Sequence, residues 1–255
     1  MLRKDLRREL ARPSTADPAE IARFDALAEE WWKPHGAFKV VHAFNRARVD
    51  YLGAQLPKLL GRDAGAAKPL HGLRLIDVGC GAGIVTEAMA RQGAAVLGID
   101  AAERNVAIAQ KHAQGTGADI EYRQALPEDL ADEAGSFDVV LSLEVVEHVA
   151  DPAAFVAALG RLVKPNGILV VGTINRTVRS FIKAIVGAEY VLGWLPKGTH
   201  DWRKFVTPGE LDGWLGDQVF TVEARSGVTF DFLRRRWSTL ADESCLYLRI
   251  YRRRP

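Results

Sequence analysis

Short apolar runs alternate with helical stretches through the middle of the chain, and this alternation constrains the fold more than any other feature. The strand-like runs span residues 73–79, 94–100, 120–124, 137–143 and 168–174. Helical patterns at 84–93, 106–114 and 152–163 separate them, and KPNG at 164–167 is typical of a turn. Strands that are apolar on both sides belong to a parallel sheet covered by helices on both faces.

Two further alternating runs, VFTVEAR and CLYLRIY, follow a helical segment near the C-terminus. Together with the five central runs they predict an α/β fold, Rossmann-like and doubly wound, with a mostly parallel seven-stranded sheet. At 255 residues we expect a polar, flexible N-terminus over 1–20 and one domain over 21–255. Within that domain we expect a helical cap, a cofactor-binding core, an insertion for substrate or membrane, and a C-terminal helix with strands, at residues 21–60, 73–174, 175–206 and 207–255.

A glycine-rich loop, DVGCGAG at 77–83, lies between the first predicted strand and its helix. Glycines let the backbone approach a ligand closely, and the helix N-terminus offers free N–H groups. Asp100 ends the next strand, where a carboxylate can accept both hydroxyls of a ribose. A dinucleotide loop requires a third glycine at position 84, which is Ile here, so the spacing favours a nucleoside with a short amino-acid tail.

Longer segments resemble a known family. IDVGCGAG, GID at 98–100, FDVVLSLEVVEHV at 137–149 and LVKPNGILVV at 162–171 resemble class I S-adenosylmethionine-dependent methyltransferases. FDALAEEWWKPHGAFKVVHAFNRAR at 24–48 and VGAEYVLGWLPKGTHDWRKFVTP at 186–208 resemble, more narrowly, the ubiquinone biosynthesis O-methyltransferases. The family's N-P-x-R motif lacks its proline here. The resemblance runs from about residue 20 to 210, and the stretch after about residue 225 does not match the family.

The resemblance implies an enzyme that transfers methyl groups from S-adenosylmethionine to ring hydroxyls of polyprenylated phenol or catechol intermediates in ubiquinone biosynthesis. It places the cofactor against four residues: Arg48, Gly79, Asp100 and Leu143. An arginine fork suits the methionine carboxylate, the glycine permits close approach, and the strand-end leucine can flank the cofactor.

Glu144, Glu147 and His148 are spaced so that one helical turn would place them on the same face. Two interpretations remain open: a rim of hydrogen-bonding groups, or a divalent ion bound by the two carboxylates and the imidazole. The resemblance favours magnesium. A phenol loses its proton near pH 10, so either His148 acts as general base or the ion lowers the phenol pKa. For His200 we favour an ordinary surface-loop residue over a substrate contact.

The insertion carries apolar residues at helical spacing with arginines and a lysine near its start, and both chain ends are basic. Two interpretations again remain: an interfacial helix that meets anionic lipid, or an internal lid that packs on the core. No apolar run is long enough to span a bilayer, and two cysteines suit a reducing compartment. We expect a cytoplasmic protein, peripheral on the inner face of the cytoplasmic membrane, with a ubiquinone-biosynthesis complex as partner.

The balance of 34 Lys and Arg against 32 Asp and Glu argues against nucleic acid as a partner. Other functions are weighed beside the methylation of ring hydroxyls. They are a different phenolic or ring-carbon acceptor, a non-catalytic cofactor-binding scaffold, and a nicotinamide dehydrogenase. The GAEY and PKGTHD segments argue against a different acceptor. The intact Arg48 and Asp100 argue against a non-catalytic scaffold, and the missing third glycine argues against a dehydrogenase.

Overall fold

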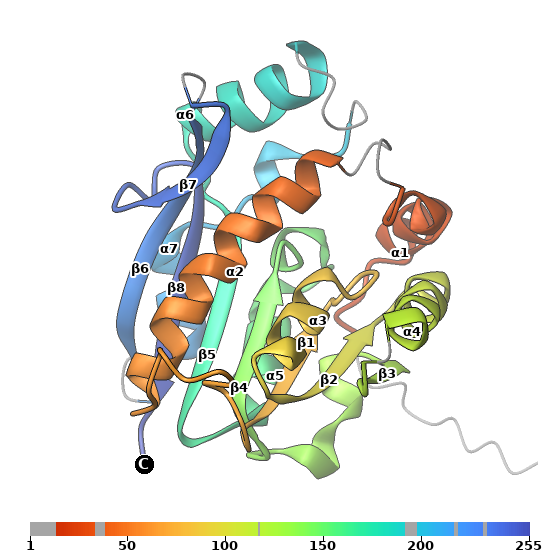
Figure 1. Cartoon of the computed structure of the whole chain (residues 1–255). Helices are drawn as coiled ribbons and strands as arrows, with labels where there is room; N and C mark the ends of the chain where they lie inside the picture. The colour runs from red at the N-terminus through yellow and green to blue at the C-terminus, as the bar shows by residue number, and fades with distance from the viewer. Residues whose placement is uncertain (1–13, 34–38, 117, 192–197, 217–218, 232–233) are drawn as a thin grey trace, which may run out of the picture.

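The computed structural model describes residues 14–33, 39–116, 118–191, 198–216, 219–231 and 234–255. Over these residues a single mixed sheet forms the middle of the molecule, with helices on both faces (Figure 1). Its strands are β1 (Arg74–Val78), β2 (Ala95–Asp100), β3 (Glu121–Gln124), β4 (Phe137–Leu143), β5 (Val163–Ile174), β6 (Phe220–Asp231), β7 (Arg236–Leu240) and β8 (Leu246–Arg253).

The strand order is β3-β2-β1-β4-β5-β8-β6-β7. The first five strands of that order are parallel, and the other three pair antiparallel. The predicted doubly wound, mostly parallel sheet is therefore confirmed. The described residues form eight strands rather than seven, because β7 pairs with the outer half of β6. Arg234 and Arg235 precede this strand and Arg236 begins it, which leaves too little apolar alternation to reveal it.

The segment 164–167 differs from its prediction as a turn, because it lies inside β5. There the pairing with β4 is irregular: Phe137 pairs with Val163, but Val139 pairs with Ile168. Asn166 has a φ of 63°, so the turn-forming residues bend the strand outward locally without ending it.

Two hydrophobic cores lie on opposite faces of the sheet. Ile76 and Leu75, adjacent in β1, point into different cores, as the alternation of a strand requires. One face is covered by α5 (Pro152–Leu162) and α7 (Pro208–Leu215), and the other by α2 (Lys39–Leu59) and α3 (Ile84–Arg91) (Figure 1). α4 (Glu103–Thr116) packs on β2 and β3.

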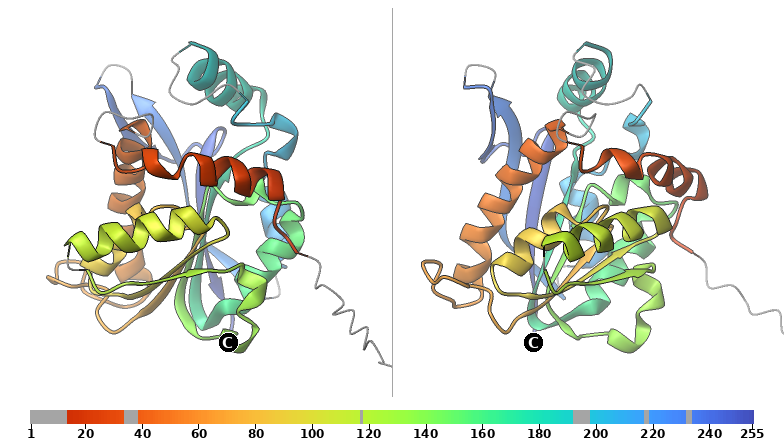
Figure 2. Two further views of the ribbon diagram at one scale, coloured as in Figure 1. Left: turned by 90° about the vertical axis from the view of Figure 1, so that its right-hand side faces the viewer. Right: turned by 45° about the vertical axis from the view of Figure 1, so that its right-hand side comes forward.

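The N-terminal cap begins earlier than predicted. Residues 1–13 of the segment predicted to be flexible lie outside the described residues, but Thr15 is buried and its N–H donates to Glu128 Oε1 at 2.8 Å. Helix α1 (Pro18–Ala26) starts after Asp17, whose side chain caps it. A 3-10 turn at Ala28–Glu30 follows, and this segment runs alongside α4 (Figure 2).

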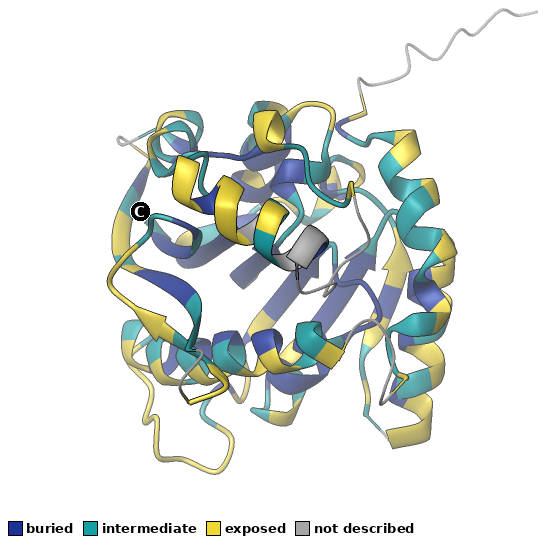
Figure 3. Cartoon of the chain, turned by 90° about the horizontal axis from the view of Figure 1, so that it is seen from above, coloured by how far each residue is buried: buried dark blue, intermediate teal, exposed yellow. Residues whose placement is uncertain are grey.

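The insertion begins with α6 (Val178–Ser180), and the helix continues through Phe181–Val191 in π geometry. Its Ile185 packs on Ile174 and Phe205, whereas Val178 is 73% exposed and Ile182 55% exposed. Seen from above, this helix carries exposed residues along its outer side (Figure 3). Trp194, part of the predicted apolar pattern, lies outside the described residues. No helix in the described part of the chain could cross a bilayer.

Candidate active site

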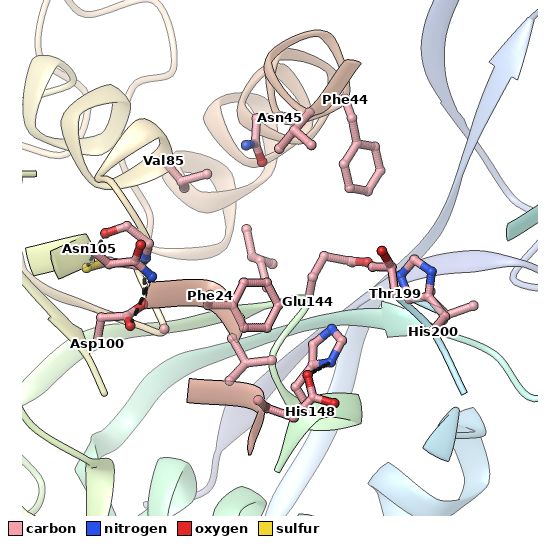
Figure 4. A pocket seen from close by; sticks show the side chains of 18 of the residues that line it. Phe24, Phe44, Asn45, Val85, Asp100, Asn105, Glu144, His148, Thr199 and His200 are labelled. Atoms are coloured by element: carbon pink, nitrogen blue, oxygen red, sulfur yellow. Dashed lines mark hydrogen bonds and ion pairs between the residues drawn. The ribbon is translucent and has the colours of Figure 1, made fainter. Parts of the chain in front are cut away.

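A cavity of about 750 Å³ lies at the carboxyl ends of the parallel strands. The glycine loop, the ends of β2 and β4, the N-terminal cap, the insertion and the β6–β7 pair all contribute to its wall (Figure 4). Ligands of open α/β sheets bind at this edge, and the volume is within the range of small-molecule sites.

The glycine loop takes a shape that other residues would not permit. Gly79 has a φ of 76°, and a Cβ there would stand 2.3 Å from a methyl carbon of Val145. The N–H groups of Gly79 and Cys80 both donate to the carbonyl of Ile99, which ties the loop to β2. The loop is thereby held open toward the cavity.

Asp100 fastens the same loop from the end of β2. Its carboxylate accepts the N–H of Gly81 at 2.8 Å, the N–H of Ala102 at 2.9 Å and the amide of Asn105 at 3.3 Å. Burial raises the pKa of Asp100 above its usual value. Asp77, at the start of the loop, is also buried, and burial raises its pKa to about 6 although Thr86 donates to it at 2.7 Å.

Trp31 of the cap lies over this end of the cavity, and sequence reasoning did not identify it. Its indole N–H donates to Asn105 at 3.1 Å, and a Cβ on Gly81 would stand 3.1 Å from its ring. The aromatic residues near 31 were visible as a cluster, but no spacing linked them to the glycine loop. The cap therefore closes the cavity over the loop and Asp100.

Arg48 projects from α2 into the cavity and is only 4% exposed. Its guanidinium donates to Glu144 Oε1 at 3.1 Å and to Asn45, and it stacks 4.0 Å from the centre of the Phe44 ring. Its Nε is buried without a hydrogen-bond partner among the described residues. A buried cation with a free donor fits a bound carboxylate.

Leu143 and Glu144 occupy the point where β4 ends. Leu143, which the family resemblance places against the cofactor, is buried and lines the cavity. Glu144 has a φ of 58°, a left-handed conformation that is uncommon outside glycine and often marks functional sites. Its N–H donates to the carbonyl of Gly172, and its side chain pairs with Arg48.

The structure does not bring Glu144, Glu147 and His148 together as a magnesium site. In the ranges that the structure describes, no three His, Cys, Asp or Glu side chains are placed to hold a metal ion. Glu147 is buried away from the cavity wall, accepts the hydroxyl of Thr173 at 2.7 Å, and has its pKa raised to about 8 by burial. Without an ion beside it, this buried carboxyl group favours its neutral form. A magnesium site at these residues stays a prediction.

His148 lines the cavity and is held by the N-terminal helix. Its Nδ1 lies 3.2 Å from Oε2 of Glu20 and 3.4 Å from a guanidinium nitrogen of Arg23, while Phe24 packs edge-on against the ring. The two contacts favour different tautomers: the Glu20 carboxylate would take a hydrogen from Nδ1 and leave the lone pair on Nε2, whereas Arg23 can only donate and needs the lone pair on Nδ1. Burial lowers the pKa of His148, so the neutral base predominates at neutral pH. No sequence signal had pointed to Glu20.

His200 is not the surface residue that the sequence suggested, because its side chain is only 9% exposed and lines the same cavity. Its Nδ1 lies 2.9 Å from Oε1 of Glu189, and burial lowers its pKa to about 4. The two imidazole rings of His148 and His200 lie 6.2 Å apart, centre to centre (Figure 4). His200 follows Pro and Gly in the sequence, as residues of surface loops often do, and this pattern does not indicate how little of its side chain is exposed.

The fold and this site define the class. A family model described as "Methyltransferase domain" matches residues 76–171. Among solved structures, magnesium protoporphyrin IX methyltransferase from Synechocystis, with bound S-adenosylmethionine, has a TM-score of 0.61 at 21% identity, over 94% of this chain and 99% of that one. The same protein with S-adenosylhomocysteine has a TM-score of 0.63 at 24% identity, over 92% and 95%. The protein is a class I S-adenosylmethionine-dependent methyltransferase.

Curated relatives narrow the class to a family. Ubiquinone biosynthesis O-methyltransferase from Azorhizobium caulinodans is 49% identical over 92% of both chains. The namesake from Mesorhizobium japonicum is 48% identical over 93% of this chain and 95% of its own, and that from Cereibacter sphaeroides 50% identical over 88% and 91%. The chain belongs to the ubiquinone biosynthesis O-methyltransferase family.

Proposed function

We propose that the protein transfers a methyl group from S-adenosylmethionine to a ring hydroxyl of polyprenylated phenol or catechol intermediates in ubiquinone biosynthesis. The observation that carries the proposal is a neutral, carboxylate-held imidazole, His148, on the wall of a cavity whose other end is the glycine loop. Family membership indicates the class of substrate, and the residues that line the cavity indicate the reaction.

The cofactor end of the cavity has a donor or acceptor for each part of S-adenosylmethionine. Asp100 would accept the ribose hydroxyls, Gly79 would give the backbone room to approach, and Leu143 would flank the ligand. The unpaired Nε of Arg48 would meet the methionine carboxylate. When bound, S-adenosylmethionine supplies a methyl group already activated by the sulfonium charge.

His148 would take the phenolic proton. In this role the Nδ1 hydrogen would point to the Glu20 carboxylate, and the lone pair on Nε2 would be the acceptor. A phenol has an unperturbed pKa of about 10, and a base placed at its hydroxyl assists removal of the proton as the oxygen attacks the methyl carbon. The buried wall excludes water, which would compete for the methyl group.

The far wall of the cavity is apolar and suits a prenylated ring. Phe44 of α2 packs against Trp237 of β7 with ring centres 5.0 Å apart, and Val228 of β6 is buried beside them. This wall includes the C-terminal strands, where the sequence offered no family match. The prenyl tail would leave the cavity along these side chains.

The exposed apolar residues of the insertion support peripheral contact with anionic membrane lipid. Val178 and Phe181 are exposed while Ile185 anchors the helix, and Arg179 lies among them. A polyprenyl substrate resides in the bilayer, so a cytoplasmic enzyme at the membrane surface would have direct access to it. A complex with other enzymes of the pathway would bring the same advantage.

Mass spectrometry after incubation with labelled S-adenosylmethionine and a short-chain prenyl catechol tests the activity. The expected product carries the label on a ring oxygen. A label on a ring carbon would favour the alternative acceptor, and tight cofactor binding without transfer would favour a scaffold role. His148→Ala should reduce transfer by about 100-fold or more, the usual contribution of a general base.

A further inference from the structure

The cavity contains a second imidazole held by a carboxylate, which the transfer of one proton does not require. Glu189 of the insertion is buried, and its two oxygens accept N–H groups from Gly198 and His200 at 2.7 and 2.9 Å. The ring Nδ1 of His200 meets the same carboxylate at 2.9 Å, and Phe205 packs edge-on against the ring. Glu189 thereby fixes both the loop and the imidazole.

The hydrogen-bond pattern determines which nitrogen of His200 is open. A carboxylate only accepts hydrogen bonds, so Nδ1 must carry the hydrogen and Nε2 must be the acceptor. In the tautomer that the proposed function requires, with the Nδ1 hydrogen beside Glu20, Nε2 of His148 is also an acceptor. The cavity therefore presents two neutral acceptors, on rings whose centres are 6.2 Å apart and whose planes differ by 31°.

The two histidines differ in strength as bases. Burial and the neighbouring His148 lower the pKa of His200 to about 4. Such a weak base accepts a hydrogen bond from a hydroxyl group but does not remove its proton. A ring with two adjacent hydroxyls would give one proton to His148 and one hydrogen bond to His200.

Resting on the proposed function, we propose that the Glu189–His200 pair recognises the second, unreactive hydroxyl of the substrate ring and so selects a catechol over a monophenol. A site built around a buried acceptor disfavours a ligand that leaves this acceptor without a partner. His200 would orient the ring so that the other hydroxyl faces His148 and the methyl donor.

Calorimetric binding of a short-chain prenyl catechol and the matching prenyl phenol tests the proposal in the protein saturated with S-adenosylhomocysteine. His200→Ala should weaken catechol binding by about tenfold, the value of one hydrogen bond to a buried group, and phenol binding by less than about twofold. His200→Gln, whose amide oxygen accepts, should recover part of the preference. Asp201→Asn, an exposed change on the same loop, should alter neither affinity.

Equal losses for both ligands in His200→Ala, or no loss for either, would overturn the proposal. The measurement contains no transfer step, so its outcome is separate from that of the methylation assay. A wild-type protein that prefers catechol but transfers no methyl group would refute the proposed function and still support this selection. Glu189→Gln adds a second test, because a neutral amide should hold the ring less firmly and reduce the preference without abolishing it.

Discussion

Replacing Glu20 with Gln should weaken His148 as a base and change the pH dependence of the reaction in a distinctive direction. The Nδ1 atom of His148 lies 3.2 Å from Oε2 of Glu20. The amide of Gln can still accept the Nδ1 hydrogen, so the ring keeps its tautomer and loses only the neighbouring negative charge. The variant therefore isolates the electrostatic part of the contact.

The magnitude follows from the charges around the ring. Burial lowers the pKa of His148, and the Glu20 carboxylate opposes that effect. The opposite charge of Glu20 favours the charged imidazole and so raises the pKa of His148. Without it the pKa of His148 falls further, and the weaker base should lower the plateau of kcat/KM by about tenfold.

The sign can be read from the pH profile. Only the neutral imidazole accepts the proton, so kcat/KM falls as pH drops through the pKa of His148 in the free enzyme. In Glu20→Gln that acid limb should move to lower pH while the plateau falls. The variant is then slower on the plateau but retains a larger share of its own maximum in acid.

Asp17→Asn is the matched control. Asp17 lies on the same cap and pairs with Lys204 at 3.2 Å, as Glu20 does at 3.5 Å, but it does not touch His148. The control should keep the wild-type limb and plateau. If both variants lose activity equally and neither moves the limb, Glu20 acts only by fastening the helix, and the assignment of His148 as base is refuted.

Four further outcomes are expected. Asp100→Ala removes the acceptor of two backbone N–H groups, so it should lower Tm by about 4–8 °C and weaken S-adenosylmethionine binding at least tenfold by calorimetry; unchanged affinity would remove it from the site. Gly79→Ala should lose both stability and cofactor binding, since its Cβ would stand 2.3 Å from a valine methyl. The control Gly61→Ala, at φ 65° with open space, should lower the free energy of unfolding in denaturant by only about 1–2 kcal/mol. Excess EDTA should leave methyl transfer within about twofold if an imidazole alone removes the proton; loss restored by Mg²⁺ would assign that role to an ion. The protein should sediment with phosphatidylglycerol or cardiolipin liposomes, and Val178→Asp with Phe181→Asp should abolish sedimentation; no binding by the wild type at low salt would make the helix a plain lid.

The cofactor half of the site could be anticipated from sequence because local rules determine it. A strand that ends in glycines and is followed by a helix must turn sharply, and Gly79 and Gly81 occur where that turn needs positive φ. Asp100 is reached by counting to the end of the next parallel strand, which the sheet places beside the first. The positions of these groups follow from chain order and strand pairing alone.

The acceptor half could not be anticipated in the same way. Glu20 meets His148 across 128 positions of sequence, and no periodicity records a contact between a cap helix and a strand-end turn. His200 was assigned to the surface because Pro, Gly and Thr precede it, yet the buried Glu189 draws that loop inward. The metal interpretation depended on helical spacing, which places side chains on one face but does not determine how deeply each is buried.

This difference has a physical cause, because the two halves of the site are held by different parts of the fold. Strand pairing positions the cofactor residues at the strand ends. Both histidines instead contact carboxylates of the N-terminal cap and the insertion. Arg23 of the cap donates to the carbonyl of Thr199 at 2.8 Å, and Lys204 reaches back to the cap. The cap and the insertion are thus joined to each other beside the two histidines. Because Glu20 lies on one of these segments and Glu189 on the other, the positions of both imidazoles depend on how the cap and the insertion pack together.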